Sequence, residues 1–119
     1  LCCGKVYYDL LAARREKKIT DIAIVRVEQL YPFPKDSLEK ELAKYPKASE
    51  IVWTQEEPRN QGAWYWIASR HHLDTQLGIK QKMLLVSRPA SSSPAVGYLA
   101  KHNEQQKALI ESALGKIEY

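Results

Sequence analysis

Short runs rich in β-branched residues alternate along this chain with longer amphipathic runs, and that alternation constrains the fold most strongly. Residues 22–27, 51–54 and 83–86 are apolar runs of the length expected for buried strands. The segments between and around them carry apolar residues at helical spacing, which predicts helices over these ranges: 5–17, 36–45, 61–73 and 98–114. Strands that alternate with helices favour parallel pairing. The sequence therefore predicts an α/β fold, a three-layer, doubly wound domain with a mainly parallel sheet.

The first strand of this pattern is short. Only Leu1, Cys2 and Cys3 precede Gly4, and the chain begins with Leu instead of Met. A strand usually needs about five residues, so we expect a truncated first strand and a chain that is a piece of a larger protein. Its 119 residues fit one domain, 1–119, because single domains most often have about 100–150 residues.

Several residues carry the signals of helix ends. Asp36 and Glu39 have the spacing of a capping box, and Asn60 is a candidate N-cap for the third helix. Gly115 is suited to ending the last helix, and the basic run from Arg14 to Lys18 suits the C-terminal end of the first.

Composition narrows the class of protein. The chain is 45% hydrophobic and 27% charged, which is ordinary for a soluble globular protein. No apolar stretch approaches the ~18 residues of a membrane span, so no membrane partner is expected. Cys2 and Cys3 are adjacent, a poor arrangement for a disulfide or a metal site. We therefore expect a reducing, cytoplasmic location and no metal.

The net charge of +4 is concentrated in residues 58–88. That segment holds five basic residues against one acidic residue: Arg59, Arg70, Lys80, Lys82 and Arg88, with Asp74. The excess is either an ordinary solvated surface or one that faces an anion or an acidic partner domain. Nucleic acid is the weakest alternative, because the basic residues are not interleaved with aromatic residues.

The unusual residues fall in the loops that follow the predicted strands. In a doubly wound sheet, ligands gather beyond the carboxyl ends of the strands, so these loops predict a docking or binding edge. The candidate interface or regulatory anion residues are Gln29, Glu56, Glu57, Arg59, Asn60, Gln61, Gly62, Trp64 and Arg88. The aromatic residues Tyr31, Phe33, Trp64, Tyr65 and Trp66 exceed what one small core needs, and some of them are expected to face another domain or subunit.

Catalytic chemistry is not favoured at this edge. Consecutive residues leaving a strand point to opposite sides, so Glu56 and Glu57 are not a ready-made acid/base pair. We expect one of them to pair with Arg59 or Arg88 and the other to cap the next helix. Gly62 either presents free N–H groups to an anion or, more simply, permits close backbone packing.

Neither a metal site nor a nucleophile is evident in the sequence. His71 and His72 lack the i, i+4 spacing of a helical metal pair. The serines at 91–93 have no obvious histidine partner. We therefore predict no catalytic residue in this chain.

Four motifs then carry a resemblance to a known family. They are G-K-V-Y-Y-D-L at 4–10, A-I-V-R-V-E-Q-L-Y-P-F-P at 23–34, Q-E-E-P-x-N-Q-G-A-W at 55–64 and R-P-A-S-S-S-P-A-V-G-Y at 88–98. In this order and at these intervals they closely resemble the C-terminal domain of the decarboxylating component of 2-oxoglutarate dehydrogenase, in its bacterial form. The resemblance extends from Gly4 to about Leu114.

The resemblance implies a domain of the transketolase C-terminal type within a homodimeric enzyme. That enzyme uses thiamine diphosphate and magnesium to decarboxylate 2-oxoglutarate in the citric acid cycle, and it passes the succinyl group to the lipoyl arm of a dihydrolipoyl succinyltransferase core. The cofactors and catalytic residues would belong to upstream domains. This chain would bind neither cofactor and would pack on those domains and on the second subunit.

One regulatory site of the family can be compared residue by residue. The actinobacterial branch binds acetyl-CoA near the loop after the second strand, and its glutamine there matches Gln29. Its arginine pair falls on Asp36 and Ser37 here, which removes the cations that bind phosphate. The resemblance thus implies that acetyl-CoA regulation is lost or much weakened.

Three interpretations follow. The chain is a structural and dimerisation domain of the dehydrogenase, or additionally a regulatory nucleotide- or anion-binding module that uses Arg59, Arg88 and the start of the third helix. Alternatively, it is the equivalent domain of a related 2-oxo acid dehydrogenase.

Overall fold

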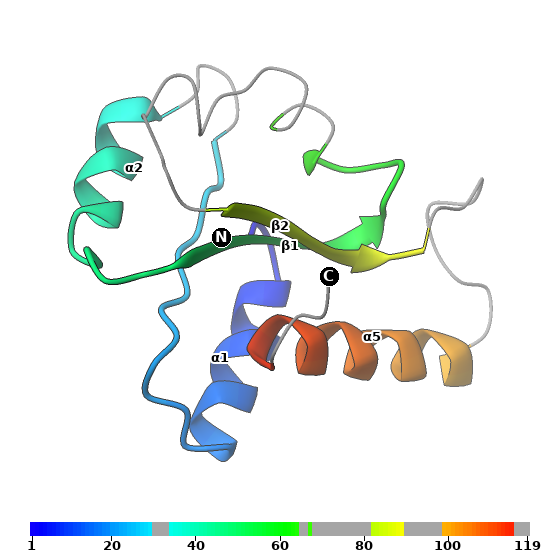
Figure 1. The fold of residues 1–119 in the computed structure, drawn as a ribbon. Coiled ribbons are helices and arrows are strands. Elements are labelled where there is room, and N and C mark those ends of the chain that lie inside the picture. Colours follow the sequence, from blue (N-terminus) through cyan, green and yellow to red (C-terminus); the bar gives the residue numbers. More distant parts are fainter. Residues whose placement is uncertain (30–33, 65–66, 68–81, 90–98, 116–119) are drawn as a thin grey trace.

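The computed structural model describes residues 1–29, 34–64, 67, 82–89 and 99–115. Within them it has three α-helices and two strands, shown in Figure 1. In chain order these are α1 (Val6–Glu16), α2 (Lys35–Leu42), β1 (Glu50–Pro58), β2 (Lys82–Arg88) and α5 (Leu99–Leu114). The predicted helices at 5–17 and 98–114 and the predicted strands at 51–54 and 83–86 are therefore confirmed, with small differences at their ends.

The strands pair in parallel, as predicted. Strand β1 pairs with β2 in a register that sets Ile51 opposite Met83 and Thr54 opposite Val86. The register is irregular between Thr54 and Pro58, and the pairing resumes where Pro58 lies opposite Arg88. The chain is thus a small α/β domain with a parallel pair of strands.

The chain's first residues lie between two neighbouring segments. Cys2 forms parallel bridges to Arg26 on one side and to Thr54 on the other. The Cys2 N–H donates to the Val25 carbonyl at 3.0 Å, and the Thr54 N–H donates to the Leu1 carbonyl at 2.8 Å. The extended segments therefore follow the order 22–27, 1–3, β1, β2. The strand predicted over 22–27 was too long, because its described pairing is this single bridge at Arg26.

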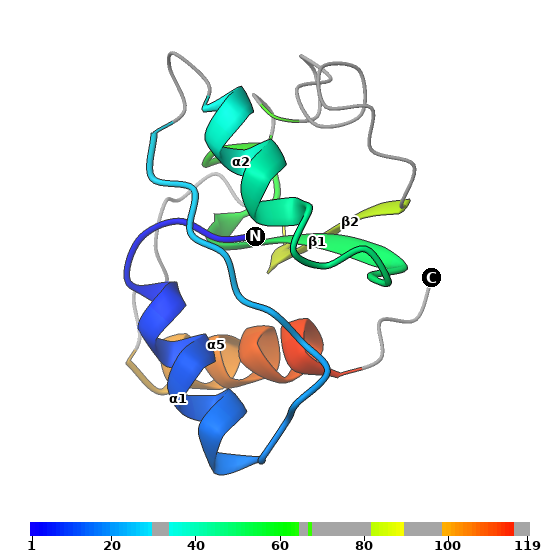
Figure 2. The same cartoon turned by 90° about the vertical axis from the view of Figure 1, so that its left-hand side faces the viewer.

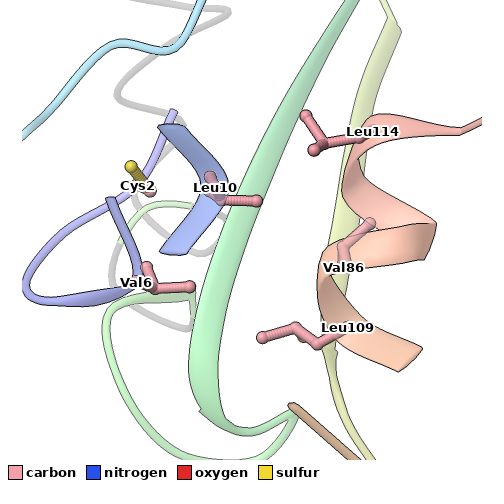
Figure 3. Packing of buried hydrophobic residues seen from close by; sticks show 6 residues of the cluster. All are labelled: Cys2, Val6, Leu10, Val86, Leu109 and Leu114. Carbon is pink, nitrogen blue, oxygen red and sulfur yellow. The ribbon is translucent and has the colours of Figure 1, made fainter. Parts of the chain in front are cut away.

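Helices cover both faces of the strands. Helices α1 and α5 lie on one face and α2 lies on the other, as Figures 1 and 2 show. Each face has its own core. The first core contains Cys2, Val6, Leu10, Val86, Leu109 and Leu114 (Figure 3), and the second contains Val27, Leu38, Trp53 and Ile67.

The strands contribute alternate residues to the two cores. Val52 and Val86 pack in the first core, whereas Trp53 and Leu85 pack in the second. Successive side chains of a strand point to opposite faces, so a strand covered on both faces must be apolar throughout. This explains why 51–54 and 83–86 are continuous apolar runs.

Helix ends followed the sequence signals only in part. Arg14 and Arg15 lie in the last turn of α1, and Gly115 follows α5, as predicted. The capping box at Asp36 was wrong, because α2 begins at Lys35 after Pro34 and has no side-chain cap. Proline fixes φ near the helical value and suits a helix start.

The third predicted helix, 61–73, lies mostly outside the described residues. Trp64 and Ile67 are helical there, and the Ile67 N–H donates to the Ala63 carbonyl at 3.0 Å. Within the part of the chain that the structure describes, no helix combines the length and the apolar character needed to span a bilayer.

Candidate functional site

The predicted binding residues gather where β1 and β2 end, but the strand extends further than predicted. Residues 55–58, expected in a loop, belong to β1, because Pro58 still pairs with Arg88. The loop begins at Arg59, whose N–H donates to the Arg88 carbonyl at 2.9 Å. A turn follows, with the Gln61 N–H bonded to the Pro58 carbonyl at 2.9 Å.

Gln55 organises this turn, and the sequence interpretation missed it as a site residue. Its side chain is buried, and its Oε1 accepts from the Trp53 Nε1–H and from the Trp64 backbone N–H, both at 3.0 Å. Its Nε2 donates to the carbonyls of Pro58 at 3.0 Å and Gln61 at 2.8 Å. A single amide thus ties strand, turn and the start of the next helical turn together.

The Gln55 side chain caps one N–H of the helical turn that follows. Its amide oxygen accepts the Trp64 N–H, a role that the sequence interpretation had not assigned to Gln55. The same bond removes one of the N–H groups on which an anion site at this helix start would depend. Trp64 itself is half-buried against the second core.

Gly62 is required by the geometry of the turn. Its φ is +70°, and a Cβ placed on it would lie 3.1 Å from the Glu57 Cβ and 3.2 Å from the Gln55 Oε1. Residues with a side chain adopt positive φ at a steric cost. Close packing, the simpler of the two predicted explanations, therefore accounts for this glycine.

Glu56 and Glu57 lie on opposite sides of β1, as predicted. Glu56 accepts from the Lys5 Nζ at 2.6 Å and from the Gln106 Nε2 at 2.8 Å, whereas Glu57 is exposed beside Gly62. The hydrogen bond from Lys5 to Glu56 raises the pKa of Lys5. The expected ion pair between a glutamate and Arg59 or Arg88 does not form among the described residues, because α1 and α5 bring Lys5 and Gln106 to Glu56 instead.

Arg88 is buried at the end of β2. Its Nη2 donates to the Gln106 Oε1 at 2.6 Å, and its Nη1 lies 3.1 Å from the His102 Nδ1. Arginine only donates hydrogen bonds, so the His102 Nδ1 must be the acceptor. The buried Arg88 Nε has no hydrogen-bond partner among the described residues.

These contacts form one polar cluster, which we call the carboxyl-edge network. Its members are Lys5, Asp9, Glu56, Arg88, His102 and Gln106. The Gln106 amide lies at its centre, since it accepts from Arg88 and donates to Glu56 and, at 3.1 Å, to Asp9. Two carboxylates balance the two permanent cations, and the network joins α1, α5 and both strands.

A second cluster, also missed in the sequence, surrounds Glu28 after the 22–27 segment. Its carboxylate accepts from the Gly4 N–H at 3.0 Å, from the Cys3 Sγ at 3.3 Å and from the Arg26 Nε at 3.1 Å. The Gly4 bond is the main cause that lowers the pKa of Glu28. Burial first, and then the bond to Glu28, raise the pKa of Cys3 to about 11.

The remaining predicted residues lie at the periphery. Arg59 and Asn60 are exposed, as is Gln29. Gln29 and Ser37 line a cavity of about 450 Å³ next to α2, and Asp36 is exposed nearby. Tyr31, Phe33, Tyr65, Trp66, His71, His72 and the serines at 91–93 lie outside the described residues.

The polar contacts at this edge mainly hold elements of the fold together. The described carboxylates of the network bind cations and amides that join elements, and the buried amide of Gln55 satisfies a turn. No group of three or more histidine, cysteine or acidic residues is placed to hold a metal ion, as far as the described ranges extend. Towards solvent this edge presents exposed polar and basic side chains, among them Arg59, whereas the Arg88 Nε–H is buried.

Comparison with known proteins gives a consistent result. The sequence model of the family "2-oxoglutarate dehydrogenase C-terminal" matches residues 1–114. The chain is 55% identical over 117 residues to the 2-oxoglutarate dehydrogenase E1 component of Cupriavidus necator, a match that covers 98% of this chain. It is 51% identical to the protein of that name from Haemophilus influenzae, with 96% of the chain covered, and 49% identical to the one from Azotobacter vinelandii, with 95% covered. The chain spans 12% of the length of each of these relatives.

Proposed function

Because this chain belongs to the 2-oxoglutarate dehydrogenase C-terminal family, we propose that it is the structural and dimerisation domain of a 2-oxoglutarate dehydrogenase E1 component. The match of that family to residues 1–114 is the observation that carries the proposal. In this proposal the chain is a single domain of the transketolase C-terminal type. The sandwich of α1 and α5 on one face and α2 on the other is compatible with that fold.

The proposed parent enzyme is a cytoplasmic homodimer. It decarboxylates 2-oxoglutarate with thiamine diphosphate and magnesium, and it transfers the succinyl group to the lipoyl arm of a dihydrolipoyl succinyltransferase. As the family resemblance implies, we assign both cofactors and the catalytic residues to other parts of the enzyme. The proposed role of this chain is to pack against those parts and against the second subunit.

The proposal is tested by the oligomeric state of the whole enzyme. We expect the complete E1 component to sediment as a dimer, and a version that lacks the residues matched by this chain to sediment as a monomer. Circular dichroism of the shortened enzyme controls for global unfolding. A folded, dimeric enzyme without this domain would contradict a dimerisation role.

A second role at the same edge is favoured by one specific observation, the unpartnered Nε–H of buried Arg88 within the described part of the chain. A buried arginine N–H without an acceptor is unfavourable, and an anionic ligand would satisfy it. We infer a regulatory nucleotide or anion site there, with Arg59 at its rim. Calorimetry of the whole enzyme with AMP and with acetyl-CoA tests it, comparing the natural enzyme with Arg88→Ala and Arg59→Ala.

The calorimetric titration with acetyl-CoA has a different expected result. The actinobacterial branch of the family resembles this chain, but it has arginines at the positions of Asp36 and Ser37. We therefore expect no activation by acetyl-CoA through the loop near Gln29. Heat released on adding AMP that disappears with Arg88→Ala supports the anion site. No heat with either ligand excludes these nucleotides.

The equivalent domain of a related 2-oxo acid dehydrogenase is the other assignment, and turnover of the whole enzyme with different 2-oxo acids separates the two.

A further inference from the structure

The segment 22–27 is the outermost extended stretch of the described fold, and one of its two edges is open. Cys2 pairs with the inner edge, where the Cys2 N–H donates to the Val25 carbonyl at 3.0 Å and the Val27 N–H donates to the Cys2 carbonyl at 2.8 Å. Neighbouring residues of an extended strand direct their backbone groups to opposite edges. The N–H and carbonyl groups of Arg26 and Glu28 therefore point away from Cys2, and no hydrogen bond joins them to another described residue.

A cavity lies along this open edge, between the two helices that flank it. Its volume is about 450 Å³, and its lining includes the backbone of 24–29, Tyr7 of α1, and Leu38 and Glu41 of α2. The edge faces the viewer in Figure 2, where the light-blue trace of 22–27 lies in front of the strands. An open strand edge is a template for pairing with another strand.

The charges on this edge favour a second copy of the same segment as the partner. Arg26 and Glu28 are both exposed, and the Arg26 Nε lies 3.1 Å from the Glu28 Oε1, so the two side chains share a face. Residues directly opposite each other in an antiparallel pair also share a face. Two copies that cross at Val27 set each Arg26 opposite a Glu28, whereas a crossing at Arg26 sets two arginines opposite each other, which is unfavourable. Charge complementarity therefore selects the register centred on Val27.

Aromatic side chains beside the edge also suit a protein partner. Tyr8 is 59% exposed, and its ring meets that of Tyr7 edge to face with the centroids 5.2 Å apart. The Arg26 guanidinium lies 4.9 Å from the Tyr7 ring centroid and 5.5 Å from that of Tyr8. Tyrosine and arginine are enriched at protein–protein interfaces, so the open edge adjoins a surface with the composition of an interface.

We propose that residues 26–28 form an interface between two copies of this chain, in which the two segments pair antiparallel about a twofold axis at Val27. Arg26 of each copy exchanges both backbone hydrogen bonds with Glu28 of the other, and the two pairs of side chains form symmetric ion pairs. The proposal rests on the dimerisation role proposed above, because that role brings two copies of the chain into one enzyme. It names the surface through which the domain would perform that role.

The test uses the complete E1 component with two charge reversals, Arg26→Glu and Glu28→Arg. Each reversal alone sets like charges opposite each other at both symmetric positions, so we expect it to raise the dimer dissociation constant at least about tenfold. In an equimolar mixture of the two variants, the acidic pair of one chain faces the basic pair of the other, and dimers should form with about the natural affinity. Sedimentation equilibrium measures all of these constants.

Two exposed residues of α5 supply matched controls. Lys107→Glu and Glu104→Arg make the same changes of charge on another element, and we expect neither to change the dimer dissociation constant. Amide hydrogen exchange adds a direct readout, because the Arg26 and Glu28 amides should exchange at least about tenfold more slowly in the natural dimer than in the monomers of either variant. The Val27 amide, which is bonded to Cys2 within the chain, should be protected in both.

Three results would overturn the interface. They are charge reversals that leave the dimer dissociation constant unchanged, a mixture that dimerises no better than either variant, and equal protection of the Arg26 and Glu28 amides in monomers. The last result would mean that another segment of the enzyme covers the edge. An enzyme that stays dimeric after deletion of this domain refutes the dimerisation role itself, whereas a monomeric deletion form with unaffected charge variants refutes this edge alone.

Discussion

At the scale of single residues, one buried amide explains the turn after β1. Gln55 satisfies two N–H donors, from Trp53 and Trp64, and its own amide hydrogens are taken by carbonyls of the turn. A buried polar group is tolerated only when it is hydrogen-bonded. Both ends of this side chain therefore matter, and neither glutamate nor alanine can replace it without leaving polar atoms unsatisfied.

We expect Gln55→Ala to lower the free energy of unfolding by about 2–4 kcal/mol, because it leaves the Trp53 indole N–H and the Trp64 N–H buried without acceptors. Gln55→Glu should also destabilise, since it sets an oxygen against the carbonyls of Pro58 and Gln61. The exposed neighbour Glu57→Gln is the control and should change stability by no more than about 0.5 kcal/mol. Urea unfolding measures all three, and equal stability of Gln55→Ala and Glu57→Gln would refute this role.

Cys3 allows a prediction about reactivity. Its pKa of about 11, against an ordinary 9.0, makes its thiolate rare near pH 8. The higher nucleophilicity of a more basic thiolate offsets part of that effect. In a Cys2→Ala background we expect iodoacetamide to modify Cys3 about tenfold more slowly in the folded chain than in urea.

A substitution of Glu28 measures how much its carboxylate slows the alkylation of Cys3. After burial, the hydrogen bond to Glu28 is the largest cause of the raised pKa of Cys3. Glu28→Gln removes the carboxylate, so it should accelerate alkylation of the folded chain without changing the rate in urea. Mass spectrometry of the modified peptide follows both rates. An unchanged rate in Glu28→Gln would mean that burial alone protects the thiol.

At the scale of elements, the hydrophobic pattern predicted the parts of the strands that pack in the core. It did not predict how far β1 extends by pairing with β2. The apolar runs at 51–54 and 83–86 marked both strands, because strands covered on two faces must be apolar throughout. The extension of β1 through Glu56 and Glu57 was missed, since polar residues that continue a strand at its exposed end resemble a loop. The register to Arg88 that holds Pro58 in the strand has no signal in the local sequence.

Alanine substitutions at Gly4 and Gly62 distinguish the cost of backbone strain from the cost of steric crowding. Gly4 has φ +79° and open space where a Cβ would lie, whereas Gly62 has φ +70° and a Cβ there would crowd Glu57 and Gln55. We expect Gly4→Ala to cost about 1 kcal/mol from backbone strain and Gly62→Ala at least about 2 kcal/mol from strain plus crowding. Thermal unfolding compares them, and an equal cost for both would show that crowding contributes nothing.

At the scale of the whole molecule, the two ends of the strands differ in character. The carboxyl end carries the network of Lys5, Glu56, Arg88 and Gln106, whereas a cavity of about 640 Å³ lies beside the amino end of β1. The prediction that Glu56 and Arg88 lie at the same edge is confirmed. The expectation that one of the two glutamates pairs with Arg59 or Arg88 was wrong among the described residues, because Lys5 and Gln106 bind Glu56 instead and contacts between distant elements cannot be read from sequence spacing.

The role proposed above for this domain is to support catalysis elsewhere in a 2-oxoglutarate dehydrogenase without performing it. The most direct measurement is 2-oxoglutarate decarboxylation by three samples: this chain alone, the rest of the E1 component alone, and the two mixed. We predict negligible turnover by either part and recovered turnover in the mixture. Turnover by this chain alone, or undiminished turnover by the enzyme that lacks it, would contradict the account.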